Sequence, residues 1–374
     1  MDIADVDNKL MARAIELARK GDPSPNPPVG SVVANGETIV AEGYHERAGL
    51  EHAELIALRE AGDKARGSTL YVTLEPCNHD GRTPPCTEAI LAAGVKRVVI
   101  GCRDPNPHVT GKGAERLQAE GIEVILGMME NDAKALIRPW RKYITEQTAY
   151  LSIKLALSLD GRIATRTGAS RWITCAESRL RVQALRSAHD AVMVGINTVI
   201  ADDPLLTVRD IPGRSPVRVI VDSKLRLPTS SQMVVTAKEV PTCVVTTKGA
   251  SRAASESLEA AGVAVIPVPP TAEGRCDMKV ALRELAAREV VSVLCEGGAE
   301  LTGSLLAARL PDELHAFVAP LLLGPRGRAG AVDWAGPESP GDAPHIEPAR
   351  WELCGCDAYV SGPLVFPKRG ATQA

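Results

Sequence analysis

Strand-like and helix-like segments alternate along this chain, and this alternation constrains the fold more than any other feature of the sequence. Before residue 130, apolar residues at helical spacing predict helices at 6–20, 52–61, 87–93 and 114–120. The strands predicted between them are 29–33, 38–42, 68–74, 96–101 and 122–126, the first two joined as a hairpin. Strands that alternate with helices are typical of an α/β layer fold.

A second run of alternation begins after a polar helical stretch at 132–142. We place a domain boundary between Glu146 and Gln147, which divides the chain into domains 1–146 and 147–370. In the second domain we expect strands at 150–157, 190–194, 217–222, 242–246, 263–267 and 291–295. The helices expected between them are 176–187, 251–261, 278–288 and 301–308. Residues 324–348 are rich in glycine and proline and are expected to form a long surface loop.

The bulk composition excludes several classes of function. The 374 residues suffice for two domains, and 43 basic against 46 acidic residues leave no global basic field to attract nucleic acid. The acidic start lacks a signal-peptide pattern, and no apolar run approaches the roughly 20 residues that span a bilayer. Nine scattered cysteines without a signal indicate reduced thiols. We therefore expect a cytoplasmic protein that binds a small molecule and neither nucleic acid nor membrane.

His52, Glu54, Cys77 and Cys86 form the most informative group of residues in the sequence. One imidazole and two thiolates can hold Zn²⁺ and leave its fourth position for water, whose pKa zinc lowers to about 7. Glu54 lies two residues beyond His52 at a predicted helix start, where its carboxylate can move protons between that water and a leaving amine. The pattern predicts a deaminase with Glu54 as catalytic residue and one Zn²⁺ bound by His52, Cys77 and Cys86.

The spacing of the two cysteines leaves some roles open. Eight residues separate Cys77 from Cys86, where the common zinc-deaminase pattern has two. His79, within this insertion, is an alternative ligand, although a place in the pocket wall fits it better. His45 either faces the substrate or lies in a solvated loop.

Residues 73–86 (TLEPCNHDGRTPPC) resemble the bifunctional riboflavin-biosynthesis deaminase–reductase family, in which the long cysteine spacing is the usual form. The further matching stretches are 25–30 (PNPPVG), 104–107 (DPNP), 154–161 (KLALSLDG), 172–174 (WIT), 197–204 (NTVIADDP) and 296–298 (EGG). The resemblance extends from about residue 8 to residue 367. It implies a cytidine-deaminase-like α/β/α layer sandwich followed by a dihydrofolate-reductase-like α/β domain.

The second domain by itself gives weaker signals. It lacks the Gly-x-Gly-x-x-Gly pattern of Rossmann domains. Gly298 follows a buried run at 290–295, where glycines let backbone N–H groups approach a phosphate, although a plain turn is the alternative. Lys154 on an apolar strand must be paired or functional. Arg186 fits either a phosphosugar contact or a solvated helix face.

The resemblance assigns roles to individual residues. It implies that Asn26 contacts the pyrimidine ring and that Lys154 hydrogen-bonds the sugar near the reacting carbon. The other substrate contacts that it implies are Ser170, Arg186, Leu206, Arg209 and Glu296. The NADPH contacts that it implies are Ala156, Trp172, Thr198, Asp202, Ser223, Gly298, Ala299, Glu300, Leu301, Thr302, Gly303 and Ser304.

Two consecutive reactions on one small molecule are implied by the resemblance. The first is hydrolytic deamination of 2,5-diamino-6-ribosylamino-4(3H)-pyrimidinone 5′-phosphate. The second is NADPH reduction of the ribosyl side chain to ribityl. The resemblance also implies a homo-oligomer, a dimer or tetramer built through the reductase domain.

Other interpretations stay open from the sequence. The chain could be a lone nucleobase or tRNA deaminase fused to a binding module, or a deaminase whose reductase half has decayed. Asp202 and Asp203 could supply paired carboxylates for a metal or for acid–base work, although a loop that shapes the cofactor pocket fits them better. The stretch 354–356 (CGC) has no partner ligands nearby in the sequence and is interpreted as strand cysteines.

Overall fold

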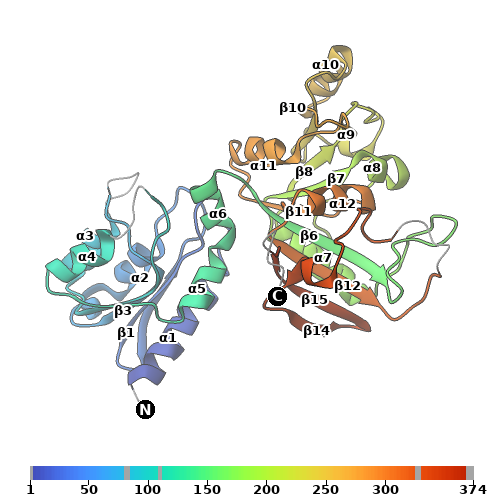
Figure 1. The fold of residues 1–374 in the computed structure, drawn as a ribbon. Coiled ribbons are helices and arrows are strands. Elements are labelled where there is room, and N and C mark those ends of the chain that lie inside the picture. The colour runs from blue at the N-terminus through green and yellow to red at the C-terminus, as the bar shows by residue number, and fades with distance from the viewer. Residues whose placement is uncertain (1–2, 80–84, 108–111, 325–329, 368–374) are drawn as a thin grey trace. The chain divides into compact units, whose positions relative to one another are not determined.

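The computed structural model describes residues 3–79, 85–107, 112–324 and 330–367. The chain divides into two compact units, Met1–Gln147 and Thr148–Ala374 (Figure 1). Residues 80–84 of the cysteine insertion and 325–329 of the glycine- and proline-rich stretch lie outside the described residues.

The first unit is built on a five-stranded sheet in the order β2-β1-β3-β4-β5. Its strands are β1 (Gly30–Asn35), β2 (Thr38–Tyr44), β3 (Thr69–Leu74), β4 (Arg97–Cys102) and β5 (Glu123–Leu126). β1 pairs antiparallel with β2 and β3, whereas β3, β4 and β5 are parallel. The predicted hairpin is therefore present.

Helices cover both faces of this sheet. Val32 packs in one core with α1 (Ile3–Ala18), and its neighbour Val33 packs in another with α2 (Ala53–Ala61) and α4 (Lys112–Ala119). Successive residues of a strand point to opposite faces, so the two cores lie on either side of the sheet. The remaining helices of the unit are η1 (Gly62–Ala65), α3 (Cys86–Ala93), α5 (Glu130–Leu136) and α6 (Arg138–Glu146). The predicted α/β/α sandwich is confirmed.

The second unit is built on a larger sheet, ten-stranded within the described residues, in the order β10-β9-β8-β7-β11-β6-β12-β15-β13, with β14 also paired to β15. Neighbours from β10 to β12 are parallel, and every pairing of β15 is antiparallel. The strands are β6 (Tyr150–Ser158), β7 (Ala191–Gly195), β8 (Val217–Val221), β9 (Thr242–Thr247), β10 (Ala264–Val268), β11 (Ser292–Cys295), β12 (Glu313–Ala319), β13 (His345–Ile346), β14 (Arg350–Cys354) and β15 (Asp357–Val365).

Helices also cover both faces of the larger sheet. One core contains residues of α8, α9 and α10, and the other contains residues of α11 and α12. The helices of this unit are α7 (Ala176–Ser187), α8 (Ile196–Asp202), α9 (Gln232–Val235), α10 (Arg252–Ala260), α11 (Met278–Ala286), α12 (Ala299–Ala307) and η2 (Pro340–Asp342). Because β7, β8 and β11 are parallel, the segments that follow them meet at one edge of the sheet, where open α/β sheets bind ligands.

The structure differs from the expected elements at several places. The helix expected at 132–142 is two helices, α5 and α6, and the short helices α8 and α9 were not expected. The strands β12, β14 and β15 were also not expected. β14 is only five residues long, and every residue of it except Cys354 is exposed. Among the described residues, no helix combines the length and apolar character needed to cross a membrane.

Candidate active sites

His52, Cys77 and Cys86 come together at the starts of two helices. His52 is the N-cap residue of α2, Cys86 is the first residue of α3, and Cys77 follows β3. The His52 Nδ1 atom lies 3.1 Å from Cys86 Sγ and 3.6 Å from Cys77 Sγ. Each of the three residues offers one ligand atom, and these three atoms all lie within 4.8 Å of one another. This nitrogen and sulfur set fits Zn²⁺, with room for a fourth ligand.

The surroundings of Cys77 favour its thiolate form. The thiol and the backbone N–H of Cys86 donate to Cys77 Sγ, and with nearby His52 they lower the pKa of Cys77 well below its usual range against the opposing effect of burial. The pKa of Cys86 lies above its usual range, because it donates to Cys77 and is buried. A coordinated thiol loses its proton outright, so both sulfurs suit a metal ligand set.

Glu54 lies in the first turn of α2 and is only 4% exposed. Burial raises the pKa of its carboxyl above the ordinary value, although His52 opposes this shift. A carboxyl with a raised pKa can accept a proton and release it again near neutral pH. Gly43 of β2 fixes the start of this helix, since a Cβ there would lie 2.3 Å from the carbonyl oxygen of Ala53.

Asn26 and His45 form a pair beside the zinc ligands. His45 Nδ1 lies 3.0 Å from the carbonyl oxygen of Glu51 and therefore donates to it, which leaves Nε2 to accept from Asn26 Nδ2 at 3.1 Å. The His45 ring lies 5.5 Å from the ring of His52 and is 3% exposed, so the solvated-loop alternative for His45 is wrong. Burial lowers the pKa of His45, which favours the neutral ring that this pairing needs.

Two acidic residues near this site were missed by sequence reasoning. The Glu75 carboxylate accepts from the backbone N–H groups of Asp104 (3.2 Å) and Ala114 (3.0 Å), which anchors the chain after β4. Burial raises the pKa of Asp104 to about 6. Both residues lie in the matched stretches 73–86 and 104–107, which was the available signal. His79 is exposed and is not among the three grouped ligands.

Lys154, Arg186 and Glu296 form an ion cluster in the second unit. Arg186 donates to Glu296 through Nε (2.5 Å) and Nη2 (3.0 Å), and Lys154 Nζ lies 3.2 Å from the same carboxylate. Burial acts to raise the pKa of Glu296, but the two cations outweigh it and hold that pKa at about 2. Arg186 is 8% exposed, so the solvated-face alternative for Arg186 is wrong.

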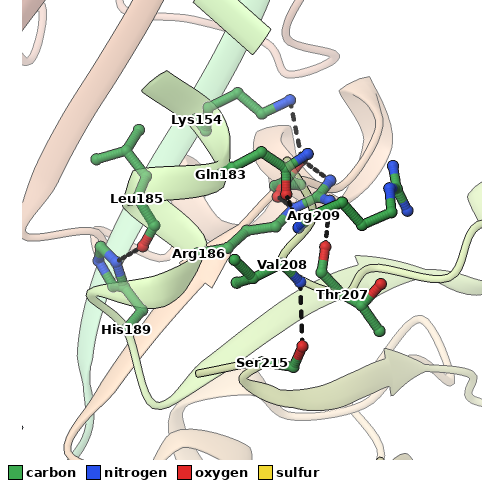
Figure 2. A network of polar contacts seen from close by, with 10 residues as sticks. Lys154, Gln183, Leu185, Arg186, His189, Thr207, Val208, Arg209 and Ser215 are labelled. Atoms are coloured by element: carbon green, nitrogen blue, oxygen red, sulfur yellow. Dashed lines mark hydrogen bonds and ion pairs between the residues drawn. The ribbon is translucent and has the colours of Figure 1, made fainter. Parts of the chain in front are cut away.

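The segment after α8 is held against this cluster, as Figure 2 shows. Arg186 Nη1 donates to the carbonyl oxygen of Thr207 (3.2 Å), and the backbone N–H of Arg209 donates to Gln183 (3.1 Å). The Arg209 side chain is exposed, whereas Leu206 is buried in the core. Ser170 is half-buried in the chain between β6 and α7.

A pocket of about 1030 Å³ opens where β7, β8 and β11 end. The residues expected to contact NADPH that line it are Thr198, Ser223, Gly298, Ala299, Glu300, Leu301 and Ser304. Gly298 is the N-cap of α12, so the first backbone N–H groups of that helix are directed toward this end, as a phosphate site requires. The geometry of the strand ends thus fits a dinucleotide cofactor.

The other residues expected to contact NADPH are not in the lining of this pocket. Trp172 is 66% exposed and stacks under the Arg179 guanidinium, 4.6 Å from its ring centre. Gly303 serves packing, since a Cβ there would lie 1.8 Å from the carbonyl oxygen of Asp333. Of the remainder, Ala156 is half-buried in β6, Thr302 is buried and Asp202 is exposed at the end of α8.

Asp203 has a structural role in the loop after α8. Its Oδ1 accepts from the backbone N–H of Gln232 (2.9 Å) at the start of α9. Within the described ranges, neither it nor Asp202 belongs to a group that could hold a metal ion. The geometry therefore gives no support to a metal bound by this acidic pair.

Basic side chains at the pocket were also missed by sequence reasoning. Lys224, Arg226, Arg275 and Lys279 line it, and all four are exposed. Arg226 Nη2 donates to Asn197 Oδ1 (2.9 Å), and Arg275 pairs with Glu300 (2.8 Å). These lysines and arginines lie on separate loops and at the start of α11 and form no sequence pattern, so only the fold could bring them together.

Comparisons with known proteins agree with both sites. Residues 4–102 match the model of the cytidine and deoxycytidylate deaminase zinc-binding region, and residues 149–360 match that of the RibD C-terminal domain. The riboflavin biosynthesis protein RibD of Aquifex aeolicus (strain VF5) is 46% identical over 86% of this chain and 89% of its own length. That of Escherichia coli (strain K12) is 41% identical over 91% and 95%. A solved structure of Acinetobacter baumannii RibD superposes with a TM-score of 0.86 at 38% identity, covering 98% of this chain and all of the other.

A zinc-binding deaminase unit and a RibD reductase unit are thus joined in one chain. The predicted resemblance and fold class are confirmed, and the chain is a deaminase and a reductase of riboflavin biosynthesis. It belongs to the RibD family of bifunctional deaminase–reductases.

Proposed function

We propose that this chain deaminates 2,5-diamino-6-ribosylamino-4(3H)-pyrimidinone 5′-phosphate and then reduces the ribosyl side chain with NADPH, which gives 5-amino-6-ribitylaminouracil 5′-phosphate. The observation that carries this proposal is the grouping of His52, Cys77 and Cys86 with buried Glu54 beside them. A similar solved protein from Thermotoga maritima, 35% identical with a TM-score of 0.83, is named as a diaminohydroxyphosphoribosylaminopyrimidine deaminase and 5-amino-6-(5-phosphoribosylamino)uracil reductase.

In the deaminase unit, His52, Cys77 and Cys86 would hold one Zn²⁺, which would act as a Lewis acid and lower the pKa of a water molecule to about 7. Glu54 accepts a proton from that water and donates one to the departing amino group, so that ammonia leaves and a ring oxo group remains. Asn26 contacts the pyrimidine edge. Its NH₂ group is directed to His45, which leaves its carbonyl oxygen as an acceptor for a ring N–H.

In the reductase unit, bound NADPH supplies the hydride. Lys154 and the Arg186–Glu296 pair position the sugar phosphate, with Ser170, Leu206 and Arg209 contributing further contacts. Lys154 donates to the ribose hydroxyl next to the reacting carbon. The ion pair with Glu296 supports this role, because it holds the end of the Lys154 side chain in place.

The pocket at the ends of β7, β8 and β11 would hold NADPH. The residues of α12 and its N-cap that line the pocket would contact the pyrophosphate, with Thr198 and Ser223 beside them; they are Gly298, Ala299, Glu300, Leu301 and Ser304. Ala156, Trp172 and Asp202 complete the site outside this pocket. Lys224 and Arg226 bind the additional phosphate that distinguishes NADPH from NADH, since exposed cations at a pocket mouth suit a phosphate dianion.

The chain functions as a homo-oligomer in a reducing, cytoplasmic compartment. Trp351 and Leu353, two residues apart on β14, are 70% and 81% exposed, and apolar side chains on one strand face are typical of an interface between subunits. All nine cysteines are free thiols, which suits a reducing compartment.

Product identification tests this function against a lone nucleoside deaminase. Zinc-loaded protein is incubated with NADPH and either the diaminopyrimidine ribotide or cytidine, and the products are identified by mass spectrometry. We expect the ribitylaminouracil phosphate from the ribotide and no uridine from cytidine. Uridine formation without the ribityl product would overturn the proposal.

A further inference from the structure

Two cysteines and an aspartate meet at the start of α7, far from the deaminase ligands in sequence. Cys175 is the N-cap residue of α7, Cys356 lies in the turn between β14 and β15, and Asp357 begins β15. One ligand atom from each falls within a group in which all members lie within 4.8 Å of one another. Cys354 ends β14, as the interpretation of strand cysteines expected, whereas Cys356 lies in the turn. The expectation that the stretch 354–356 has no partner ligands nearby is wrong, because folding brings Cys175 to it.

Gly355 makes room for this group. It has φ 61°, and a Cβ at this position would lie 2.6 Å from Glu177 Oε2 and 2.7 Å from Cys175 Sγ. Any other residue would both strain the turn and push these two ligand atoms away. Because Gly355 has no side chain, the carboxylate of Glu177 and the thiol of Cys175 can both lie next to it. Glu177 is therefore a second carboxylate near Cys175.

Asp357 is oriented as a metal ligand would be. Its side chain is fully buried, and its Oδ2 atom accepts from the backbone N–H of Cys175 (2.9 Å) and the hydroxyl of Ser178 (2.6 Å). Its other oxygen, Oδ1, faces Cys356 Sγ at 3.7 Å. In metal sites, a ligating carboxylate commonly accepts hydrogen bonds from residues outside the ligand set. These hydrogen bonds fix one of its oxygens and orient the other toward the ion.

The types of ligand atom indicate which cation this group would bind. Two sulfurs with carboxylate oxygens suit Zn²⁺, whereas Mg²⁺ and Ca²⁺ need oxygen ligands throughout. Zn–S bonds of about 2.3 Å place two thiolates about 3.8 Å apart in a tetrahedral site. The observed group therefore needs only small side-chain movements to close around an ion.

We propose that Cys175, Cys356 and Asp357, with Glu177 as fourth ligand, bind a second zinc ion that ties the start of α7 to the β14–β15 turn. On binding, each thiol releases its proton to solvent, so no oxidant or reductant takes part. The Cys175 thiol exchanges its hydrogen bond to the Cys354 carbonyl oxygen (3.0 Å) for the metal bond. Since α7 also carries Arg186, the ion fixes the helix that supports the sugar phosphate site.

Zinc content measures this site directly. The full chain is loaded with zinc in a reducing buffer, desalted and analysed by plasma mass spectrometry, with folding checked by circular dichroism. We expect two zinc ions per wild-type chain and one in Cys356→Ser, a mild change at an exposed position. Gly355→Ala should also retain one, because its Cβ displaces the ligands.

Two control variants separate this site from its neighbours. Cys354→Ser should keep two zinc ions, since Cys354 contributes its backbone carbonyl to the cluster and not its thiol. His52→Ala should keep one ion at the new site, and a further Cys356→Ser exchange should remove it. One ion per wild-type chain, or equal content in wild type and Cys356→Ser, would overturn the proposal. A Cys175–Cys356 disulfide that persists in the reducing buffer would do the same.

Discussion

Glu54 takes part in the proposed deamination but is not one of the three residues that could bind zinc. Its carboxylate can therefore be removed while the zinc ligands remain. We predict that Glu54→Gln retains zinc but loses deamination by about 10²–10⁴-fold, the usual contribution of a positioned acid–base group. Reduction of substrate that is already deaminated should stay unchanged. Ammonia release, NADPH absorbance and zinc content measure these three properties. A folded, zinc-loaded variant that has lost both activities would show that the two sites depend on each other.

Substitution of Arg226 tests whether its charge contributes to NADPH binding at the proposed cofactor site. A charge-assisted contact contributes about 1.5–3 kcal/mol, so Arg226→Ala should lower kcat/KM for NADPH by about 10–100-fold. The value for NADH should change far less, because NADH lacks the additional phosphate. Arg252→Ala is the matched control, since that side chain is 92% exposed and pairs with Glu256 on its own helix. An equal loss with both cofactors would contradict the assigned role of Arg226.

Individual site residues differ in how far the sequence could predict their surroundings. The proximity of His52 and Glu54 could be predicted from the sequence, because only one residue separates them at the start of a predicted helix. The bidentate pair of Arg186 and Glu296 joins residues 110 positions apart and depends on the order of strands in the sheet. Only the parallel sheet places the end of β11 next to α7.

The ion cluster also links three elements, since Lys154 lies on β6, Arg186 on α7 and Glu296 after β11. The pKa of Glu296 in the folded state, about 2, lies below the ordinary value of 4.5 for a glutamate side chain. Its contribution to stability is therefore complete above about pH 4.5 and is lost as the pH falls toward 2. This shift corresponds to about 3 kcal/mol.

Urea unfolding of the wild type and Glu296→Gln at several pH values measures this contribution. Three of the four tryptophans lie in the second unit, so their fluorescence reports mainly on its unfolding. We predict that the variant is less stable near neutral pH, because Lys154 and Arg186 lose their partner. The difference in free energy of unfolding between the wild type and Glu296→Gln should decrease by about 3 kcal/mol as the pH falls from about 4.5 to about 2. A difference that does not change with pH would show that the cluster does not shift the pKa of Glu296.

At the level of elements, the sequence predicted the parallel core and missed the antiparallel edge. β7, β8 and β9 are short buried apolar runs, which periodicity detects easily. β14 is only five residues long, and β15 contains Gly362 and Pro363, so neither was recognised as a strand from the sequence. β15 pairs with β12, and β14 pairs with β15, so both depend on the order of strands in the whole sheet.

At the scale of the whole molecule, one chain carries two sites with different chemistry. The first unit groups metal ligands around a buried carboxyl, and the second combines an ion cluster with a large pocket at its strand ends. A chain with a decayed reductase would have no reason to retain the bidentate Arg186–Glu296 pair or the glycine junction before α12. We therefore expect both activities to be present together.

The most direct test supplies the diaminopyrimidine ribotide to zinc-loaded protein with and without NADPH, and follows ammonia release and NADPH absorbance in the same sample. We predict ammonia in both samples and, where NADPH is present, oxidation of one NADPH for each ammonia released. Ammonia without NADPH oxidation would contradict the bifunctional assignment, and the absence of both signals would contradict the deaminase assignment as well.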